Sequence, residues 1–208
     1  MKRILLATLI LLASTSAFAQ DDMYGSLDDD INIPSATSKD NSSKYLFRMI
    51  EGGYFVSNDG KEYIVIPYEG KSAQELYNRI KSNVTMLYNS AKDVISTSEN
   101  SVISIKGYEK NAGYRPVAGF GYNVYFDISY VLKFMFKDGK IRIDAPTILS
   151  VYADNELMPE YHLWCKNQKL FVKGQRNPKR LCITEGFEKV LNGIIESILK
   201  YDETTEDW

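Results

Sequence analysis

Histidine and cysteine are scarce in this sequence of 208 residues. It contains one histidine, His162, and two cysteines. A zinc site needs several cysteines or histidines at set spacings, so the sequence does not predict one. It also lacks a Walker A loop and the glycine pattern of dinucleotide-binding proteins. We therefore expect neither a metal nor a cofactor.

A strong excess of one charge is missing as well. The chain has 25 Lys and Arg against 27 Asp and Glu, which argues against a dedicated nucleic-acid-binding protein. Beyond the N-terminus, no segment is apolar enough to predict a transmembrane helix. With 44% hydrophobic and 25% charged residues, the composition is that of a globular protein, and the length suits one domain.

The N-terminus has the three regions of a secretory signal peptide in order. Two basic residues precede an apolar run from Ile4 to Ala13, and Ala17-x-Ala19 supplies the small residues of a cleavage site. We predict that residues 1–19 are removed and that the chain is exported to the periplasm or the extracellular space. A buried N-terminal helix is the alternative.

Export to an oxidising compartment makes the two cysteines informative. Cys165 and Cys182 form an even pair, and a bridge between them would close a loop of about 17 residues. We predict a disulfide, with two free, buried thiols as the alternative.

Both ends of the exported chain are acidic. Residues 20–43 hold a run of aspartates followed by Pro, Ser and Asn, and residues 202–208 hold further acids. Such segments bury too little apolar surface to offset the entropy of ordering them. We predict an N-terminal tether over 20–43, one basic domain over 44–201 and an acidic tail over 202–208. A calcium loop in the tether is the alternative, although the aspartate spacing departs from the EF-hand pattern.

The first half of the domain combines short strands with one helix. Two β-prone runs flank an Asp-Gly turn, which predicts a hairpin over 54–66. Ser72 and Glu75 form a capping box ahead of apolar residues at helical spacing, which predicts a helix over 72–88. The next predicted segments are a strand over 102–106 and a glycine-rich loop over 110–121.

The clearest pattern is an alternation over 122–136, in which every second residue is apolar. It predicts a long strand with one buried face and one mixed face. Residues 140–144 return after a turn with the same alternation, and Pro146 is expected to end the pairing. The last predicted elements are a hairpin over 161–173 and a helix that follows Thr184.

These elements predict an α+β two-layer sandwich. Their order is β-α-β-β-β-α, with an extra hairpin before the last helix. Two amphipathic helices need a sheet face to cover, and the alternating strands supply one apolar face. Both helices are therefore expected on one face of an antiparallel sheet, and the other face is expected to stay open.

A family resemblance covers roughly Tyr63 to Ile143. It is carried by Tyr63-Ile64-Val65-Ile66, Ser72-x-x-Glu75-Leu76-Tyr77, Val102-Ile103-Ser104-Ile105-Lys106-Gly107, Tyr122-Asn123-Val124-Tyr125-Phe126 and Lys137-Asp138-Gly139-Lys140-Ile141-Arg142. In these segments the chain resembles domain-of-unknown-function family 4468, exported Bacteroidetes proteins with a TATA-box-binding-protein-like (TBP-like) fold. The resemblance implies that fold and an exported location, and it supplies no catalytic residue. It does not imply DNA binding, because function resides in sites carried by a fold.

Few residues form a recognisable catalytic arrangement. His162 and Cys165 are three residues apart, but in the predicted hairpin they would point to opposite faces. Asp127 and Asp144 are candidates to approach each other on the outer face of the long hairpin, as the paired carboxylates of a glycoside hydrolase do. We expect that the protein is not an enzyme, and the alternative is a hydrolase of envelope or dietary glycan.

A basic patch lies before the last helix. Six cations fall within fifteen residues that contain no acid: Lys166, Lys169, Lys173, Arg176, Lys179 and Arg180. Cations beside aromatic side chains bind phosphates and anionic sugars, so the patch is a candidate site for an anionic glycan or a lipid head group. The alternatives are a solvated loop that protects an edge strand and an internal partner for the acidic ends.

The outward side of the 122–136 strand is the second candidate surface. Tyr125, Val131 and Met135 are large for a face that meets only water, and Lys133 lies among them. We expect this face to contact an envelope protein or a second copy of the chain, unless residues 147–182 cover it. The sequence thus predicts an exported, non-enzymatic binding or assembly module.

Overall fold

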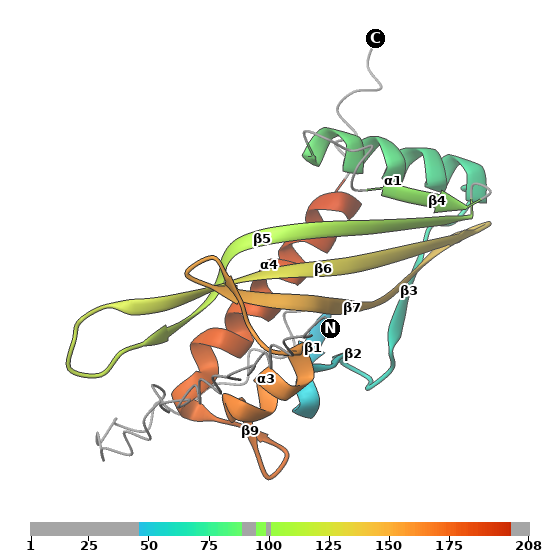
Figure 1. Cartoon of the computed structure of the whole chain (residues 1–208). Coiled ribbons are helices and arrows are strands. Elements are labelled where there is room, and N and C mark those ends of the chain that lie inside the picture. The colour runs from blue at the N-terminus through green and yellow to red at the C-terminus, as the bar shows by residue number, and fades with distance from the viewer. Residues whose placement is uncertain (1–45, 89–94, 99–100, 201–208) are drawn as a thin grey trace, which may run out of the picture. The chain divides into compact units, whose positions relative to one another are not determined.

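A long antiparallel sheet forms the centre of the structure (Figure 1). The computed structural model describes residues 46–88, 95–98 and 101–200, so the predicted signal peptide, tether and acidic tail lie outside the described residues. The strands of the sheet are β3 (Tyr63–Pro67), β4 (Ile95–Ser98), β5 (Val102–Pro116), β6 (Asn123–Lys137), β7 (Lys140–Ala153) and β8 (Glu156–Leu157). Their order is β3-β7-β6-β5-β4, and β8 pairs with the end of β7.

The central strand β6 has the predicted alternation. Every even-numbered side chain from Phe126 to Phe136 is buried, whereas the odd-numbered side chains between them are half-buried. Successive side chains of a strand point to opposite faces, so one face of the sheet forms the core and the other faces outward.

The strand β7 is longer than predicted. The pairing with β6 does not end at Pro146 but continues to Ala153, with a register shift where Val131 and Lys133 face Thr147 and Asp144. Pro146 lies in the resulting bulge. A bulge residue makes no regular hydrogen bond to the neighbouring strand, so the missing N–H group of proline removes none. The sheet therefore has a second half that the sequence pattern does not predict.

The strand β5 also extends beyond its prediction. It continues through most of the expected glycine-rich loop as far as Pro116, with a register shift between Glu109 and Gly113. The chain then turns between Val117 and Tyr122, where the Val117 N–H donates to the Tyr122 carbonyl at 3.0 Å. A bulge accommodates the irregular sequence without ending the strand.

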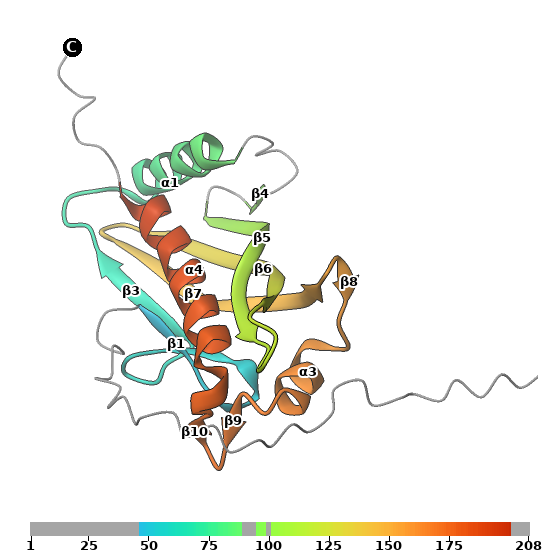
Figure 2. The same cartoon turned by 90° about the vertical axis from the view of Figure 1, so that its left-hand side faces the viewer.

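Two helices cover the buried face of the sheet, as predicted (Figure 2). The first is α1 (Ala73–Leu87), whose N-terminus has the Ser72–Glu75 capping box. The second is α4 (Leu181–Leu199), which begins before Thr184 rather than after it. Thr184 is buried inside the first turn, where its hydroxyl donates to the Leu181 carbonyl at 3.3 Å. Within the described residues, no helix is long and apolar enough to cross a bilayer.

A glycine allows α4 to approach β5 closely. A Cβ atom on Gly186 would lie 2.4 Å from the carbonyl oxygen of Ala112 and 2.9 Å from the Cα of Gly113. No side chain fits at that distance, so Gly186 is required by helix–sheet contact, although glycine lowers helix propensity.

The predicted hairpin over 54–66 is wrong in its pairing. Its first run forms β2 (Phe55–Ser57), which pairs with β1 (Phe47–Met49) across the short 3₁₀ turn η2 (Glu51–Gly53). Its second run is β3, which pairs with β7 instead. The expected turn does exist, because the Gly60 N–H donates to the Ser57 carbonyl at 2.9 Å. The strands separate because each finds another partner on its far side.

The predicted hairpin over 161–173 is a helix followed by a smaller hairpin. The helix α3 (Tyr161–Asn167) is capped at its N-terminus by Glu160, whose carboxylate accepts from the N–H groups of His162 and Leu163. The chain then forms β9 (Phe171–Val172), β10 (Gln175–Arg176) and the 3₁₀ turn η3 (Pro178–Arg180). The helix forms because an acidic cap precedes it and because Trp164 inserts into the core against Phe126 and Phe187.

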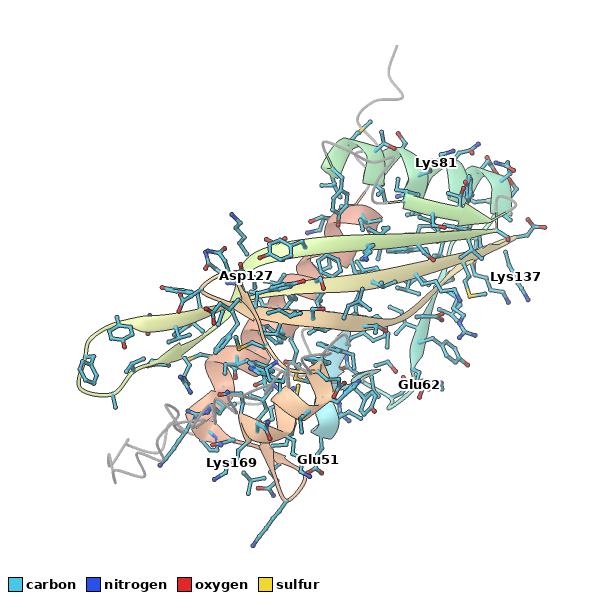
Figure 3. The ribbon with its side chains drawn as sticks, in the orientation of Figure 1. Glu51, Glu62, Lys81, Asp127, Lys137 and Lys169 are labelled. Atoms are coloured by element: carbon cyan, nitrogen blue, oxygen red, sulfur yellow. The ribbon has the colours of Figure 1, made fainter. Side chains whose placement is uncertain are left out.

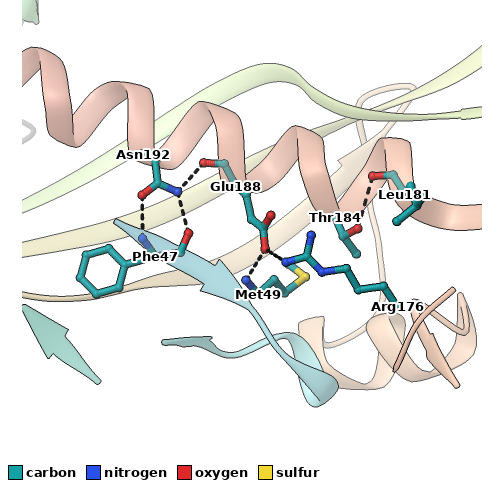
Figure 4. Close-up of polar contacts among 7 residues, drawn as sticks. All are labelled: Phe47, Met49, Arg176, Leu181, Thr184, Glu188 and Asn192. Carbon is teal, nitrogen blue, oxygen red and sulfur yellow. Dashed lines mark hydrogen bonds and ion pairs between the residues drawn. The ribbon is translucent and has the colours of Figure 1, made fainter. Parts of the chain in front are cut away.

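Side chains of α4 hold β1 in place (Figure 4). The Asn192 carboxamide accepts from the Phe47 N–H at 2.9 Å and donates to the Phe47 carbonyl at 2.8 Å. One helical turn earlier, the Glu188 carboxylate accepts from the Met49 N–H and from the Arg176 guanidinium. Both α4 side chains are buried, so these bonds satisfy backbone groups that water does not reach.

We expect Asn192→Ala to lower the free energy of unfolding by about 2–4 kcal/mol, because it leaves the buried N–H and C=O groups of Phe47 without partners. Chemical denaturation monitored by circular dichroism measures the change. Asn78→Ala is the matched control, since Asn78 is exposed on α1 and should change stability by less than about 0.5 kcal/mol. Equal effects of the two substitutions would contradict the role of Asn192.

Candidate functional site

The outward face of the sheet is the first candidate site. Of the residues predicted for it, Tyr125 is 47% exposed, and Val131, Lys133 and Met135 are half-buried on the same side of β6. Residues 147–182 do not cover this face, because they extend β7 and then form α3, whose Trp164 packs on the inward-facing Phe126. β8 borders the face at the end of β7, and residues of β2 and α3 line a cleft at the border near Arg142 and Asp144.

Tyrosines gather around Asp127, on the half of this face that lies toward β8; Figure 3 labels Asp127. The Tyr108 hydroxyl donates to the Asp127 carboxylate at 2.6 Å, and the Asn111 N–H donates to the same carboxylate at 2.8 Å. Tyr152 is the β7 partner of Asp127, and its ring contacts the Tyr108 ring edge-on at 5.6 Å. Beyond the β5 bulge, Tyr125 faces Tyr114 across the strands at 6.0 Å.

The hydrogen bond to Asp127 stabilises the neutral form of Tyr108. It raises the pKa of Tyr108 to about 12. The Tyr108 hydroxyl therefore remains a donor held by a carboxylate, and its ring orientation is fixed.

Charged groups occupy the other half of the face. The Asp144 carboxylate lies 2.8 Å from the Arg142 Nε and 3.6 Å from the Lys133 Nζ. The Arg142 guanidinium stacks over the Tyr63 ring at 4.1 Å. These contacts link β3, β6 and β7 across the outward side of the sheet.

The paired-carboxylate hypothesis is wrong for Asp127 and Asp144. Asp144 is the β7 partner of Lys133, six residues along β6 from Asp127. At the rise of a β-strand, this separates the two aspartates by about 20 Å, beyond the 5–9.5 Å that glycoside hydrolysis needs. Asp127 instead accepts from the Tyr108 hydroxyl and the Asn111 N–H, and Asp144 pairs with Arg142 and Lys133.

A cleft of about 960 Å³ opens beside the charged half, where β3 leaves the edge of β7. Its apolar wall includes Phe55, Val56 and Pro146, and its polar rim includes Glu62 and His162. A cavity of this size at a strand bulge suits a small ligand or an extended peptide segment.

His162 and Cys165 do not form a catalytic pair. Both lie on α3, so the predicted placement on opposite strand faces is wrong, but each has its own structural neighbours. The His162 Nδ1 lies 2.7 Å from the Gly52 carbonyl, and its ring stacks on Tyr54 at 4.5 Å. Burial raises the pKa of the Cys165 thiol to about 12, which disfavours a nucleophilic thiolate.

The predicted disulfide is absent, because both cysteines are free thiols. Cys165 is buried near Tyr161 and Gly53, whereas Cys182 lies in the first turn of α4 beside the Tyr114 hydroxyl. The two thiols face different elements and do not meet. Within the described residues, no cluster of His, Cys, Asp and Glu could hold a metal ion.

The basic patch is divided among several elements. Lys166 is in the last turn of α3, Lys169 follows α3, and Lys173 is in the β9–β10 turn, all exposed. Arg176 is engaged with the buried Glu188, and the Arg180 Nε donates to the Gln168 carbonyl at 3.2 Å. The patch therefore offers the four lysines, with Lys179 in η3, as its exposed cations, while both arginines serve the fold.

Sequence reasoning missed the Tyr108–Asp127–Tyr152 cluster. Tyr108 follows the predicted 102–106 strand, and Tyr152 lies beyond Pro146, where the sequence predicts that the pairing ends. The signal was present, since Ile148, Val151 and Ala153 are buried while Tyr152 faces outward. The bulge at Pro146 interrupts the alternation of buried and outward residues in β7. The outward position of Tyr152 therefore cannot be read by continuing the pattern of residues 140–144.

Comparison with known proteins identifies the fold. No family model and no curated protein matches the chain. Among solved structures, a DUF4468 family protein from Bacteroides ovatus ATCC 8483 is similar, with a TM-score of 0.52 and 12% identity over 79% of this chain and 99% of that one. A TBP-like protein from Parabacteroides distasonis ATCC 8503 aligns with a TM-score of 0.45 and 15% identity, over 67% of this chain and 92% of that one. The first match confirms the predicted α+β fold and agrees with the resemblance to family 4468.

We expect Asp127→Asn to lower the pKa of Tyr108 from about 12 toward 10, because the substitution removes the negative charge that holds the phenol proton. An NMR titration of the tyrosine rings, assigned with Tyr108→Phe, measures the shift. Asp144→Asn is the control and should leave the Tyr108 pKa unchanged, since Asp144 lies far along the sheet. A Tyr108 pKa near 10 in the unsubstituted chain would contradict the hydrogen bond.

We expect one thiol of the native chain to react with iodoacetamide and both to react after unfolding. Cys182 is partly exposed, whereas burial of Cys165 hides it and raises its pKa. Mass spectrometry of the alkylated chain counts the modified thiols. If neither cysteine reacts after unfolding without reductant, the two form a disulfide and the free-thiol arrangement is wrong.

Proposed function

We propose that the chain is an exported, non-enzymatic binding or assembly module that contacts a protein partner through the outward face of its sheet. The observation that carries the proposal is the combination of exposed tyrosines and half-buried apolar side chains on a face that no described helix covers. The buried side chains of β6 are sufficient to form the core. Core packing therefore does not explain why large side chains stand at Tyr125, Val131 and Met135 on the opposite face.

The chemistry of the face favours a protein partner. Tyrosine and methionine are enriched in interface cores, because they bury a large area and lose little side-chain entropy. Tyr108, Tyr125 and Tyr152 provide such groups on one half of the face, and Val131 and Met135 continue the apolar surface along β6. Lys133, Arg142 and Asp144 supply charged groups of both signs, which suit a polar rim.

The face is also organised before any partner arrives. Tyr108 is held by Asp127, and Lys133 and Arg142 are held by Asp144. Side chains that are already fixed lose less entropy on binding, which favours affinity. The exposed lysines of the basic patch lie on other elements and would serve as an accessory contact for an anionic glycan or lipid head group.

The export part of the proposal rests on the N-terminal signal pattern over residues 1–19. An envelope protein or a second copy of the chain would then be the available partner. The hydrolase alternative has no supporting observation, since Asp127 and Asp144 lie far apart on the sheet.

The experiment places a photo-crosslinking residue at Val131 in the full chain, expressed in the organism that makes it. We expect an adduct of defined mass at this position, which mass spectrometry identifies. The matched control is the same residue at Met86, which is 80% exposed on α1, away from the outward face. Tyr125→Ala should then weaken binding of the captured partner roughly tenfold, as truncation of an interface tyrosine does.

Either of two results would contradict the proposal. One is the absence of any adduct at Val131. The other is the same set of adducts at Val131 and at Met86, which would mean that the crosslinker reports random encounters rather than a binding face.

A further inference from the structure

The edge strand β3 has unpaired backbone groups along its outer side. Its inner side pairs with β7, and the phase of that ladder is fixed by the bonds Ala145 N–H to Glu62 C=O and Tyr68 N–H to Gly139 C=O, both 2.8 Å. In an antiparallel ladder, alternate residues bond to the same neighbour. Tyr63, Val65 and Pro67 therefore point their backbone groups away from the sheet, and no hydrogen bond from the described residues reaches them.

The side chains of β3 match this open edge. The strand reads Tyr-Ile-Val-Ile-Pro and contains no charge. Ile64 and Ile66 face the core side but are only half-buried, and Val65 on the outward side is 48% exposed. Natural edge strands are normally protected by charges, bulges or proline, and here only Pro67, at the end, has that effect.

We propose that β3 pairs with β3 of a second copy of this chain, antiparallel, about a two-fold axis at Val65. In this register Val65 faces the partner's Val65, and Tyr63 faces the partner's Pro67. The two valines exchange both of their backbone hydrogen bonds, and each Tyr63 N–H donates to the partner's Pro67 carbonyl. Proline lacks only the N–H group that would return the bond, so the edge is self-complementary apart from that position.

The same register brings matching side chains together. On the core side, Ile64 faces the partner's Ile66, so the two half-buried isoleucines of each copy cover one another. The pairing is confined to Tyr63–Pro67, because Lys61 is turned toward β2, where its carbonyl accepts from the Ser57 N–H at 2.8 Å and its ammonium group pairs with Asp59. Within these five residues the hydrogen-bonding phase is symmetric about Val65, and this self-complementarity selects a second copy over an arbitrary strand.

This pairing is independent of the proposed function. It uses the edge of the sheet, whereas the proposed contact with a partner uses the outward face. A dimer through β3 joins two sheets side by side and leaves the Tyr108, Tyr125 and Tyr152 cluster of each copy accessible.

The test is the dissociation constant of the full chain, measured by analytical ultracentrifugation, with Val65→Lys as the disrupting variant. This substitution places two like charges opposite each other at the axis and should raise the dissociation constant at least about tenfold. Val172→Lys is the matched control, because Val172 is 49% exposed on β9 and should leave the constant unchanged. Hydrogen exchange at the Tyr63 and Val65 amides should slow as the concentration rises.

Two results overturn the proposal. One is a chain that stays monomeric at millimolar concentration. The other is a dimer that tolerates Val65→Lys, because a charge at the axis must then lie outside the interface.

Discussion

One-sided burial of β6 is the constraint on which the rest of the structure depends. Its side chains from Phe126 to Phe136 enter the core at every second position, and the strands on both sides follow its pleat. Because this face is apolar at every position, whereas the other face mixes apolar and charged side chains, α1 and α4 pack on it. The outward face results from the same alternation. Its half-buried side chains, Val131 and Met135, do not contribute to the core.

The fold was predictable wherever the sequence period was regular. The β6 alternation and the α1 capping box needed no knowledge of distant residues, and both are confirmed. The predictions failed where a local signal competed with a distant partner. Residues 54–66 carry a hairpin sequence, yet β2 pairs with β1 and β3 pairs with β7. Residues 161–167 read as a strand, but the Glu160 cap and the burial of Trp164 favour a helix.

The candidate site was predictable in part for the same reason. Tyr125, Val131, Lys133 and Met135 follow from the β6 period alone. The Tyr108–Asp127–Tyr152 cluster depends on two bulges, in β5 and β7. Each bulge changes which residues face outward, and a sequence pattern with a period of two does not predict it.

The disulfide prediction failed because the spacing between Cys165 and Cys182 does not determine in which direction each side chain points. A helix places Cys165 toward Gly53, and the next helix places Cys182 toward Tyr114.

The attachment of β1 to α4 shows how a helix holds the edge of a short strand whose other edge pairs with β2. The edge of β1 that faces α4 presents the N–H and C=O groups of Phe47 and the N–H of Met49, and a helix has no free backbone groups in its middle to meet them. Side chains of α4 supply the partners. Residues four apart on a helix rise about 6.0 Å, and residues two apart on a strand rise about 6.6 Å, so Asn192 and Glu188 match Phe47 and Met49.

The carboxylate in this attachment carries a cost that depends on pH. Burial raises the pKa of Glu188, while the Met49 N–H and the Arg176 guanidinium act in the opposite direction. A carboxyl whose pKa is higher in the folded state than in the unfolded state contributes stability that is complete below its unfolded pKa near 4.5 and is lost as pH rises through its folded pKa. Arg176 limits that loss, because it keeps the ionised form hydrogen-bonded. This explains why one arginine of the basic patch is turned inward, and it leaves the outer surface of that patch to lysines.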